Sequence, residues 1–250
     1  MRLLPLVAIA FVSPAWANTY AFDTGVLSLG GQTQTAEAQI TTGANTVTVD
    51  LFNLVAGSQI VSVIQNLSGL EFTLSSTPSS ASVSSSSAPV QTPDGVGNGF
   101  GDVAGTGKNP ITGTTVAGTD PVQWALSQSA ATIELDGLGN GTQGPAQTII
   151  GKADSNGDYP NANPSIAGNS PHNPFVYYQA HFVLNVAGIN ANTSVSSVDF
   201  RWGTNDTFDT SDSDLVPTPF AATPEPRWYT LLLVSGLALL VFFRKRTAAN

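Results

Sequence analysis

Apolar and polar residues alternate along several short stretches of this chain. In GLEFTLSS, Leu70, Phe72 and Leu74 are separated by polar residues, and a period of two places successive side chains on opposite faces of a β-strand. The same alternation recurs in YYQAHFVLNV and in SSVDFRWG. We therefore predict half-buried strands over residues 70–74, 176–186 and 198–202. The core residues that this pattern predicts are Phe72, Phe182, Leu184 and Phe200.

Further stretches have strand character and are separated by turn residues. The additional predicted strands are residues 46–55, 59–64, 131–136 and 147–151. The stretch GTDPVQWALSQSA is ambiguous, because Asp120-Pro121 suits a helix start while Val122, Trp124 and Leu126 alternate; we favour a strand. Glycine- and asparagine-rich segments such as VAG and DSNGD lie between these strands. Such spacing is typical of an all-β fold, an antiparallel β-sandwich with jelly-roll or Ig-like topology.

Two segments lack the apolar residues of a core. Residues 75–87 are rich in serine, and residues 95–118 are rich in glycine. Neither segment can bury enough apolar area to offset the entropy lost on ordering. We expect residues 75–118 to form a mobile excursion from an ectodomain that spans residues 18–205.

The first 17 residues have the pattern of a signal peptide. Arg2 supplies the positive charge, residues 3–12 are apolar, and Ala15-Trp16-Ala17 is a small-x-small cleavage site. An apolar stretch of about ten residues is too short for a membrane span, which needs about 20 helical residues. We therefore expect export, with a mature chain that begins near Asn18. Because the chain has no cysteine, core packing alone must hold the exported domain together.

The C-terminal segment combines a membrane-spanning pattern with a charged end. An acidic, proline-rich spacer (206–223) precedes Pro224-Glu225-Pro226, and an apolar stretch (228–243) is followed by Arg244-Lys245-Arg246. The apolar stretch forms a hydrophobic helix of about 24 Å at about 1.5 Å per residue, which spans a bilayer if its flanking residues reach the interfaces. The basic residues then stay in the cytoplasm. We expect an outer domain and a single crossing.

The order of these three parts resembles the PEP-CTERM sorting signal of Gram-negative bacteria, here over residues 224–246. The resemblance implies a sorting motif made of Pro224, Glu225, Pro226, Arg244, Lys245 and Arg246. It also implies a membrane processing enzyme, exosortase, as partner, and an inner-membrane precursor that reaches the cell surface or the extracellular space. Members of this family tend to accompany exopolysaccharide and biofilm production. The alternative is an ordinary single-pass anchor.

Charge and residue types exclude several function classes. Residues 18–223 carry sixteen acidic and three basic side chains, so binding to nucleic acid phosphates is excluded. Cysteine is absent, and the two histidines fall in a loop (His172) and on the polar face of a strand (His181). No serine lies in a G-x-S-x-G elbow. We therefore predict no enzymatic activity. A secreted glycoside hydrolase is the less favoured alternative, because that reaction needs only two placed carboxylates.

A weak calcium pattern lies in DSNGDY. Asp154, Asn156 and Asp158 have the one-three-five spacing of an oxygen-ligand loop, but Tyr159 stands where the loop needs glycine and Ser165 where it needs glutamate. The alternative is a hairpin turn built on Asn156-Gly157. We predict no cofactor and keep calcium as an open alternative.

One aromatic residue suggests a binding function. Tyr177 is predicted to project from the strand face opposite the core, and exposed aromatic rings can stack on sugars. Our first hypothesis is an exported structural protein of the cell surface or the biofilm matrix. The alternative is a carbohydrate-binding module, with or without calcium.

Overall fold

The computed structural model describes residues 17–91, 122–138, 147–155, 157, 159–167 and 174–204. The expected signal peptide, apart from Ala17, lies outside these residues. So do the glycine-rich stretch, the acidic spacer and the sorting signal with its hydrophobic helix. Among the described residues, the fold is all-β and mostly antiparallel, as the alternation predicts.

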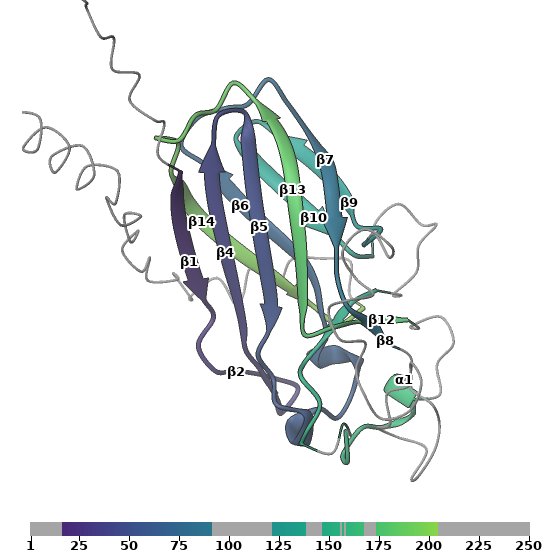
Figure 1. The fold of residues 1–250 in the computed structure, drawn as a ribbon. Helices are drawn as coiled ribbons and strands as arrows, with labels where there is room; N and C mark the ends of the chain where they lie inside the picture. The colour runs from purple at the N-terminus through teal and green to yellow at the C-terminus, as the bar shows by residue number, and fades with distance from the viewer. Residues whose placement is uncertain are drawn as a thin grey trace, which may run out of the picture.

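Two large sheets make up the fold (Figure 1). In Figure 1 one sheet, here called the front sheet, lies before the other, the back sheet. The front sheet has the strand order β1 (Asn18–Asp23), β4 (Ala36–Gly43), β5 (Thr46–Asn53), β13 (Gln179–Ala187) and β7 (Ser80–Ser87). Each of its neighbouring strand pairs is antiparallel.

The back sheet is built around β6 (Leu67–Leu74). Its order is β8 (Val90–Gln91), β12 (Phe175–Tyr177), β11 (Ile149–Ile150), β6, β10 (Thr132–Asp136) and β9 (Ala125–Ser129), and β14 (Val195–Trp202) also pairs with β6. Strands β11 and β12 are parallel. The remaining elements are a small hairpin of β2 (Leu27–Leu29) and β3 (Gln32–Gln34), two 3-10 turns, η1 (Gly57–Gln59) and η2 (Val63–Gln65), and the short helix α1 (Pro164–Ala167).

Buried residues of both sheets belong to a single hydrophobic core. Burial alternates strictly along β4 and β5, as a strand with one covered face requires. The Trp124 and Phe182 rings meet with their centroids 5.4 Å apart. The predicted core residues Phe72, Phe182 and Leu184 are fully buried. Burial of a side chain of this size stabilises the fold by roughly 1.5–3 kcal/mol.

The prediction for the end of β14 is wrong in part. Phe200 is only partly buried, whereas Arg201, which lies on the predicted polar face, is only 4% exposed. Among the described strands β14 pairs only with β6, so Phe200 is covered from one side of its strand. A register shift between Arg201 and Trp202 also breaks the alternation there, and Trp202 is buried.

The predicted strand over residues 59–64 is also wrong. This segment forms the turns η1 and η2 instead. The buried side chain of Gln65 explains the difference, because its Oε1 accepts hydrogen bonds from the backbone N–H groups of Val61 and Ser62. Its Nε2 donates to the carbonyl oxygens of Thr33 and Gln59. The Gln65 side chain, together with turn hydrogen bonds and the Ser165 hydroxyl that accepts from the Val63 N–H, satisfies the backbone of this segment without a strand partner.

A mobile excursion was expected over residues 75–118. This expectation is wrong for Val90–Gln91, which form β8, and for the serine-rich Ser80–Ser87. The serine-rich residues form β7, an edge strand of the front sheet that pairs with β13 along its length. Ala81 and Val83, both partly buried, face Val186 and Leu184 across this pairing. Ladder hydrogen bonds and these two apolar side chains hold the strand despite its serine content.

Candidate functional site

A cleft of about 310 Å³ opens where three segments distant in sequence meet. One segment follows β5, the second follows β11, and the third is the single residue between β12 and β13. The residues that line the cleft are Leu54, Val55, Ala56, Gly57, Ser58, Lys152, Ala153, Asp154 and Tyr178. The cleft therefore lies where strands of both sheets end.

Two glycines let the first two segments pack backbone to backbone. A Cβ atom on Gly57 would lie 2.5 Å from the backbone nitrogen of Asp154 and 2.8 Å from the carbonyl carbon of Ala153. A Cβ atom on Gly151 would collide with the carbonyl oxygen of Val55. Because backbone atoms cannot move aside as a flexible side chain can, any larger residue at either position would push the segments apart. The glycines thus fix the relative position of two walls of the cleft.

Tyr178 supplies the third wall and has a strained backbone. Its φ is +67°, which is an outlier for a bulky residue that is not glycine. Hydrogen bonds hold it in place, since its N–H donates to the carbonyl oxygen of Ile150 at 2.9 Å and its carbonyl oxygen accepts from the N–H of Asn53 at 3.0 Å. At this residue the chain passes from β12 in the back sheet to β13 in the front sheet. The predicted strand over residues 176–186 is therefore interrupted at Tyr178.

The Tyr178 ring has an aromatic ring and a cation as neighbours. The Phe52 ring centroid is 5.7 Å away at an interplanar angle of 56°. The Nζ atom of Lys152 lies 5.8 Å from the centre of the Tyr178 ring, within the range of cation–π attraction. Lys152 is exposed and Arg201 is buried, and these are the two Lys and Arg side chains among the described residues. The exposed cation of the described chain thus stands at this cleft.

Tyr159 anchors the loop that carries Lys152 and Asp154. Its side chain is fully buried, and its hydroxyl donates to the carbonyl oxygen of Gly151 at 2.7 Å. This contact explains why tyrosine stands where a calcium loop would need glycine, because here the residue belongs to the core. Asp154 lines the cleft and is half-buried, whereas Asn156 and Asp158 lie outside the described residues. Within the described part of the chain, no group of three or more His, Cys, Asp or Glu could hold a metal ion.

Tyr177 is less available than its predicted exposure suggests. It is half-buried, and burial raises the pKa of its hydroxyl by disfavouring the phenolate, while a backbone hydrogen bond from Ala153 acts in the opposite direction. Tyr178, which the alternation places on the inner face, is the tyrosine that lines the cleft. Lys152 and Tyr178 were not among the predicted site residues. The one signal for them in the sequence is the pair of glycines, Gly57 and Gly151, which marks a close approach of backbones.

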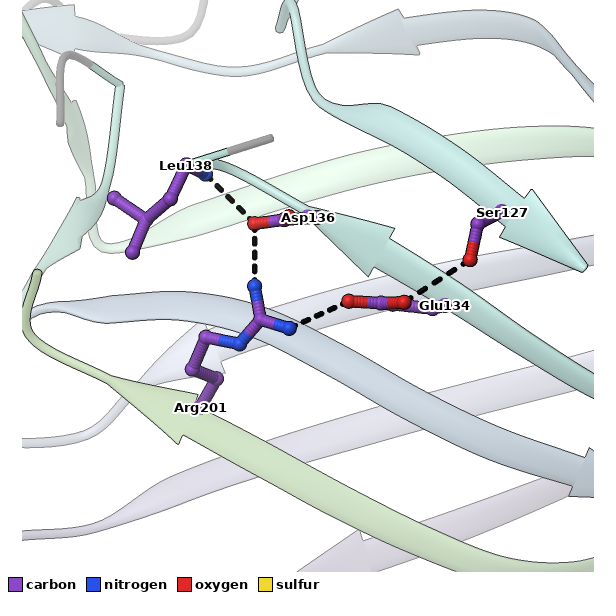
Figure 2. A network of polar contacts seen from close by, with 5 residues as sticks. All are labelled: Ser127, Glu134, Asp136, Leu138 and Arg201. Atoms are coloured by element: carbon purple, nitrogen blue, oxygen red, sulfur yellow. Dashed lines mark hydrogen bonds and ion pairs between the residues drawn. The ribbon is translucent and has the colours of Figure 1, made fainter. Parts of the chain in front are cut away.

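A second polar arrangement lies on the outer face of the back sheet. Figure 2 shows the Arg201 guanidinium between the carboxylates of Glu134 and Asp136. The Nη1 atom of Arg201 lies 2.6 Å from Asp136, whose carboxylate also accepts the Leu138 N–H at 2.8 Å. The Arg201 side chain lies directly against Gly69. A Cβ atom at that position would be only 3.1 Å from the Cβ atom of Arg201. The arrangement buries one cation among carboxylates on a sheet surface.

A row of acidic side chains adjoins this arginine. Asp199, Glu71 and Glu134 are direct cross-strand neighbours on β14, β6 and β10. The pKa of Glu71 is raised, first by burial and then by the charges of Asp199 and Glu134, while Arg201 acts in the opposite direction. Burial also raises the pKa of Asp199. These carboxylates lie on an open sheet face, and like charges side by side destabilise it at neutral pH.

A histidine and an aspartate form a pair on the outer face of the front sheet. The Nδ1 atom of His181 lies 2.7 Å from Oδ1 of Asp50, and both side chains are about two-fifths exposed. Ser87 lies opposite His181 on β7. Ser87, His181 and Asp50 are therefore the three residue types of a serine hydrolase triad, on neighbouring strands. In the described structure no hydrogen bond joins Ser87 to His181, and the cleft around Tyr178 does not include these residues. The pair is accounted for as a cross-strand contact.

The predicted sorting residues, Pro224 to Pro226 and Arg244 to Arg246, lie outside the described residues. In the portion that the structure describes, no helix has the length and apolarity to cross a membrane. No protein-family model, no curated protein and no solved structure matches this chain.

Proposed function

We propose that this chain is an exported, non-enzymatic protein of the cell surface or the extracellular matrix, sorted through its C-terminal segment. The observation that carries this proposal is the order of Pro224-Glu225-Pro226, apolar stretch and Arg244-Lys245-Arg246. Exosortase is the proposed processing partner, and exopolysaccharide the proposed surrounding of the mature protein. The apolar stretch holds the precursor in the inner membrane until it is processed.

The position of the first strand supports removal of a signal peptide. Strand β1 begins at Asn18, the residue at which the mature chain is expected to start. The Asn18 side chain donates to the carbonyl oxygen of Ala191 at 2.7 Å. The domain can therefore use its first mature residue as part of the front sheet.

The shared core supports a β-sandwich of jelly-roll or Ig-like topology. Inward-facing residues of the front and back sheets belong to one hydrophobic cluster, as expected for two sheets packed face to face. A core that draws buried apolar residues from both sheets can hold such a domain together without a disulfide.

The geometry of the polar groups favours a non-enzymatic role. Arg201 forms ion pairs with Glu134 and Asp136, and His181 and Asp50 are paired on an open sheet face. Neither of these two arrangements lines the cleft at Tyr178, whereas catalytic groups usually converge on a concave site from which water can be excluded.

Substitution of the tripeptide tests the sorting proposal. An extended Pro-Glu-Pro segment costs a protease little entropy to bind, and Glu225 offers a carboxylate for a charge-assisted contact. Changing Pro224-Glu225-Pro226 to three alanines should leave full-length precursor in the inner-membrane fraction of a host that has exosortase. The matched control changes Pro217-Thr218-Pro219, which has the same proline spacing without the glutamate, and should be processed normally. Normal processing of the first variant would contradict the proposal.

A carbohydrate-binding module is the second candidate function. The sequence pattern suggests sugar stacking on an exposed Tyr177, but this side chain is half-buried. The observation that now favours binding is the cleft lined by Tyr178, Lys152 and Asp154. Calcium stays a weak addition, since Asp154 is the one member of its predicted set among the described residues.

A further inference from the structure

We propose that the cleft at Tyr178 binds one ring of a neutral polysaccharide chain. This inference deepens the second candidate function and rests on it. It does not depend on how the C-terminal segment is processed. The volume of about 310 Å³ is at the lower end of the range for small-molecule sites, about 300–1,000 Å³. A single sugar ring suits that size.

The walls combine a flat ring with aliphatic groups. Tyr178 lines the cleft together with Leu54, Val55 and Ala56. A sugar ring has a face of C–H groups that packs against aromatic and aliphatic carbon, while its edge carries hydroxyl groups. Since Tyr178 is only half-buried, part of its surface is open to such a face. The apolar walls therefore favour a ring-shaped ligand over an extended ion.

The charged groups of the cleft favour a neutral ligand. Lys152 supplies a hydrogen-bond donor and Asp154 a carboxylate acceptor. A sugar hydroxyl can accept from the first and donate to the second. A polyanion would meet Asp154 in the cleft and the net charge of −9 on the chain as a whole. Lys152 is exposed, so its ammonium can move from the face of Tyr178 to a ligand hydroxyl.

The cleft is also held in shape before any ligand binds. Gly57 and Gly151 pack two of its segments backbone to backbone, and two backbone hydrogen bonds hold Tyr178 at a positive φ. A strained residue persists only where its surroundings hold it, and such strain is concentrated at functional sites. A preformed site loses little entropy on binding. These contacts give the Tyr178 ring a defined position against which a sugar can pack.

Calorimetric titration of the full-length protein in detergent tests this inference. The ligands are cellohexaose, mannohexaose and chitohexaose, with a hexauronate as the anionic counterpart. We expect binding of at least one neutral hexamer at up to millimolar concentration. Tyr178→Gly removes the ring and keeps a residue that tolerates positive φ, and it should weaken binding about tenfold, as expected for the loss of a stacking contact. Lys152→Gln should weaken it several-fold.

The controls separate loss of the ring from loss of the fold. Tyr178→Phe keeps the ring and should retain the affinity, and Val26→Ser, at an exposed residue outside the cleft, should bind as the parent does. Melting temperatures verify that each variant is folded. No heat of binding with any neutral hexamer, an unchanged affinity in Tyr178→Gly, or a preference for the hexauronate would each overturn the inference. None of these results would alter the processing of the C-terminal segment, so the two proposals fail separately.

Discussion

At the scale of single residues, the buried arginine is the least expected feature of this protein. Arg201 is 4% exposed and forms ion pairs with Glu134 and Asp136. Alternation predicts only that it lies on the polar face of β14. Its burial depends on Gly69 and Asp136, which are brought beside it by the pairing of β14 with β6 and of β6 with β10. A local pattern cannot contain this information, because the contacts join residues more than sixty positions apart.

Removal of Arg201 should destabilise the back sheet. In Arg201→Met the carboxylates of Glu134 and Asp136 would face each other without a cation, at a cost of about 3 kcal/mol for a broken buried ion pair. Urea unfolding measures this change. The triple variant that combines Arg201→Met with Glu134→Gln and Asp136→Asn should recover most of the lost stability, because none of the three side chains then carries an unpaired charge. An Arg201→Met protein as stable as the parent would show that the ion pairs do not contribute.

The acidic row should make the protein more stable at mildly acidic pH. The folded-state pKa values of Glu71 and Asp199 are raised above the ordinary values of 4.5 and 3.8. The folded state therefore holds these protons more tightly than the unfolded state does. The stability that the two groups contribute is present below their ordinary pKa values and is lost as the pH rises through the raised ones.

Glu71→Gln tests this pH dependence. The variant resembles the protonated state, so its urea midpoint at neutral pH should exceed that of the parent, and its stability should fall less between about pH 4 and about pH 7. Glu37→Gln, on the front sheet, is the control and should keep the parent's pH dependence. If the urea midpoints of Glu71→Gln and the parent changed identically with pH, Glu71 would not contribute to the pH dependence of stability.

At the scale of elements, strands with a clear inner face were predictable and those defined by distant partners were not. The strands over residues 70–74 and 131–136 are confirmed as β6 and β10, because an alternating strand with one buried face carries its own signal. The serine-rich β7 was missed, since its order comes from pairing with β13. Among the cleft residues only Asp154 was predicted. Tyr178 and Lys152 become neighbours only through the crossing between the sheets.

Two phenylalanines on different strands provide a test of the core. Phe182 is fully buried in β13, so Phe182→Ala should lower the free energy of unfolding by roughly 3–5 kcal/mol. Phe200 is only partly buried, so Phe200→Ala should cost clearly less. Urea unfolding of both variants gives the comparison. An equal or larger loss for Phe200→Ala would contradict the burial described for β14.

At the scale of the whole molecule, the proposed parts act in sequence. In this proposal the signal peptide directs export, the apolar stretch would hold the precursor in the membrane, and the sorting motif would present it to exosortase. The proposal places the all-β domain outside the cell, and its lack of cysteine would make it independent of the redox conditions there. The net charge of −9 on the whole chain repels polyanions.

The intact mass of the mature protein, isolated from a host that has exosortase, tests the central claim most directly. The proposal predicts a chain that begins near Asn18 and has lost its hydrophobic helix together with Arg244-Lys245-Arg246. Mass spectrometry resolves that loss without any knowledge of the ligand or the final attachment. A mature species that retains residues 231–243 in such a host would contradict the sorting proposal and leave a plain single-pass anchor.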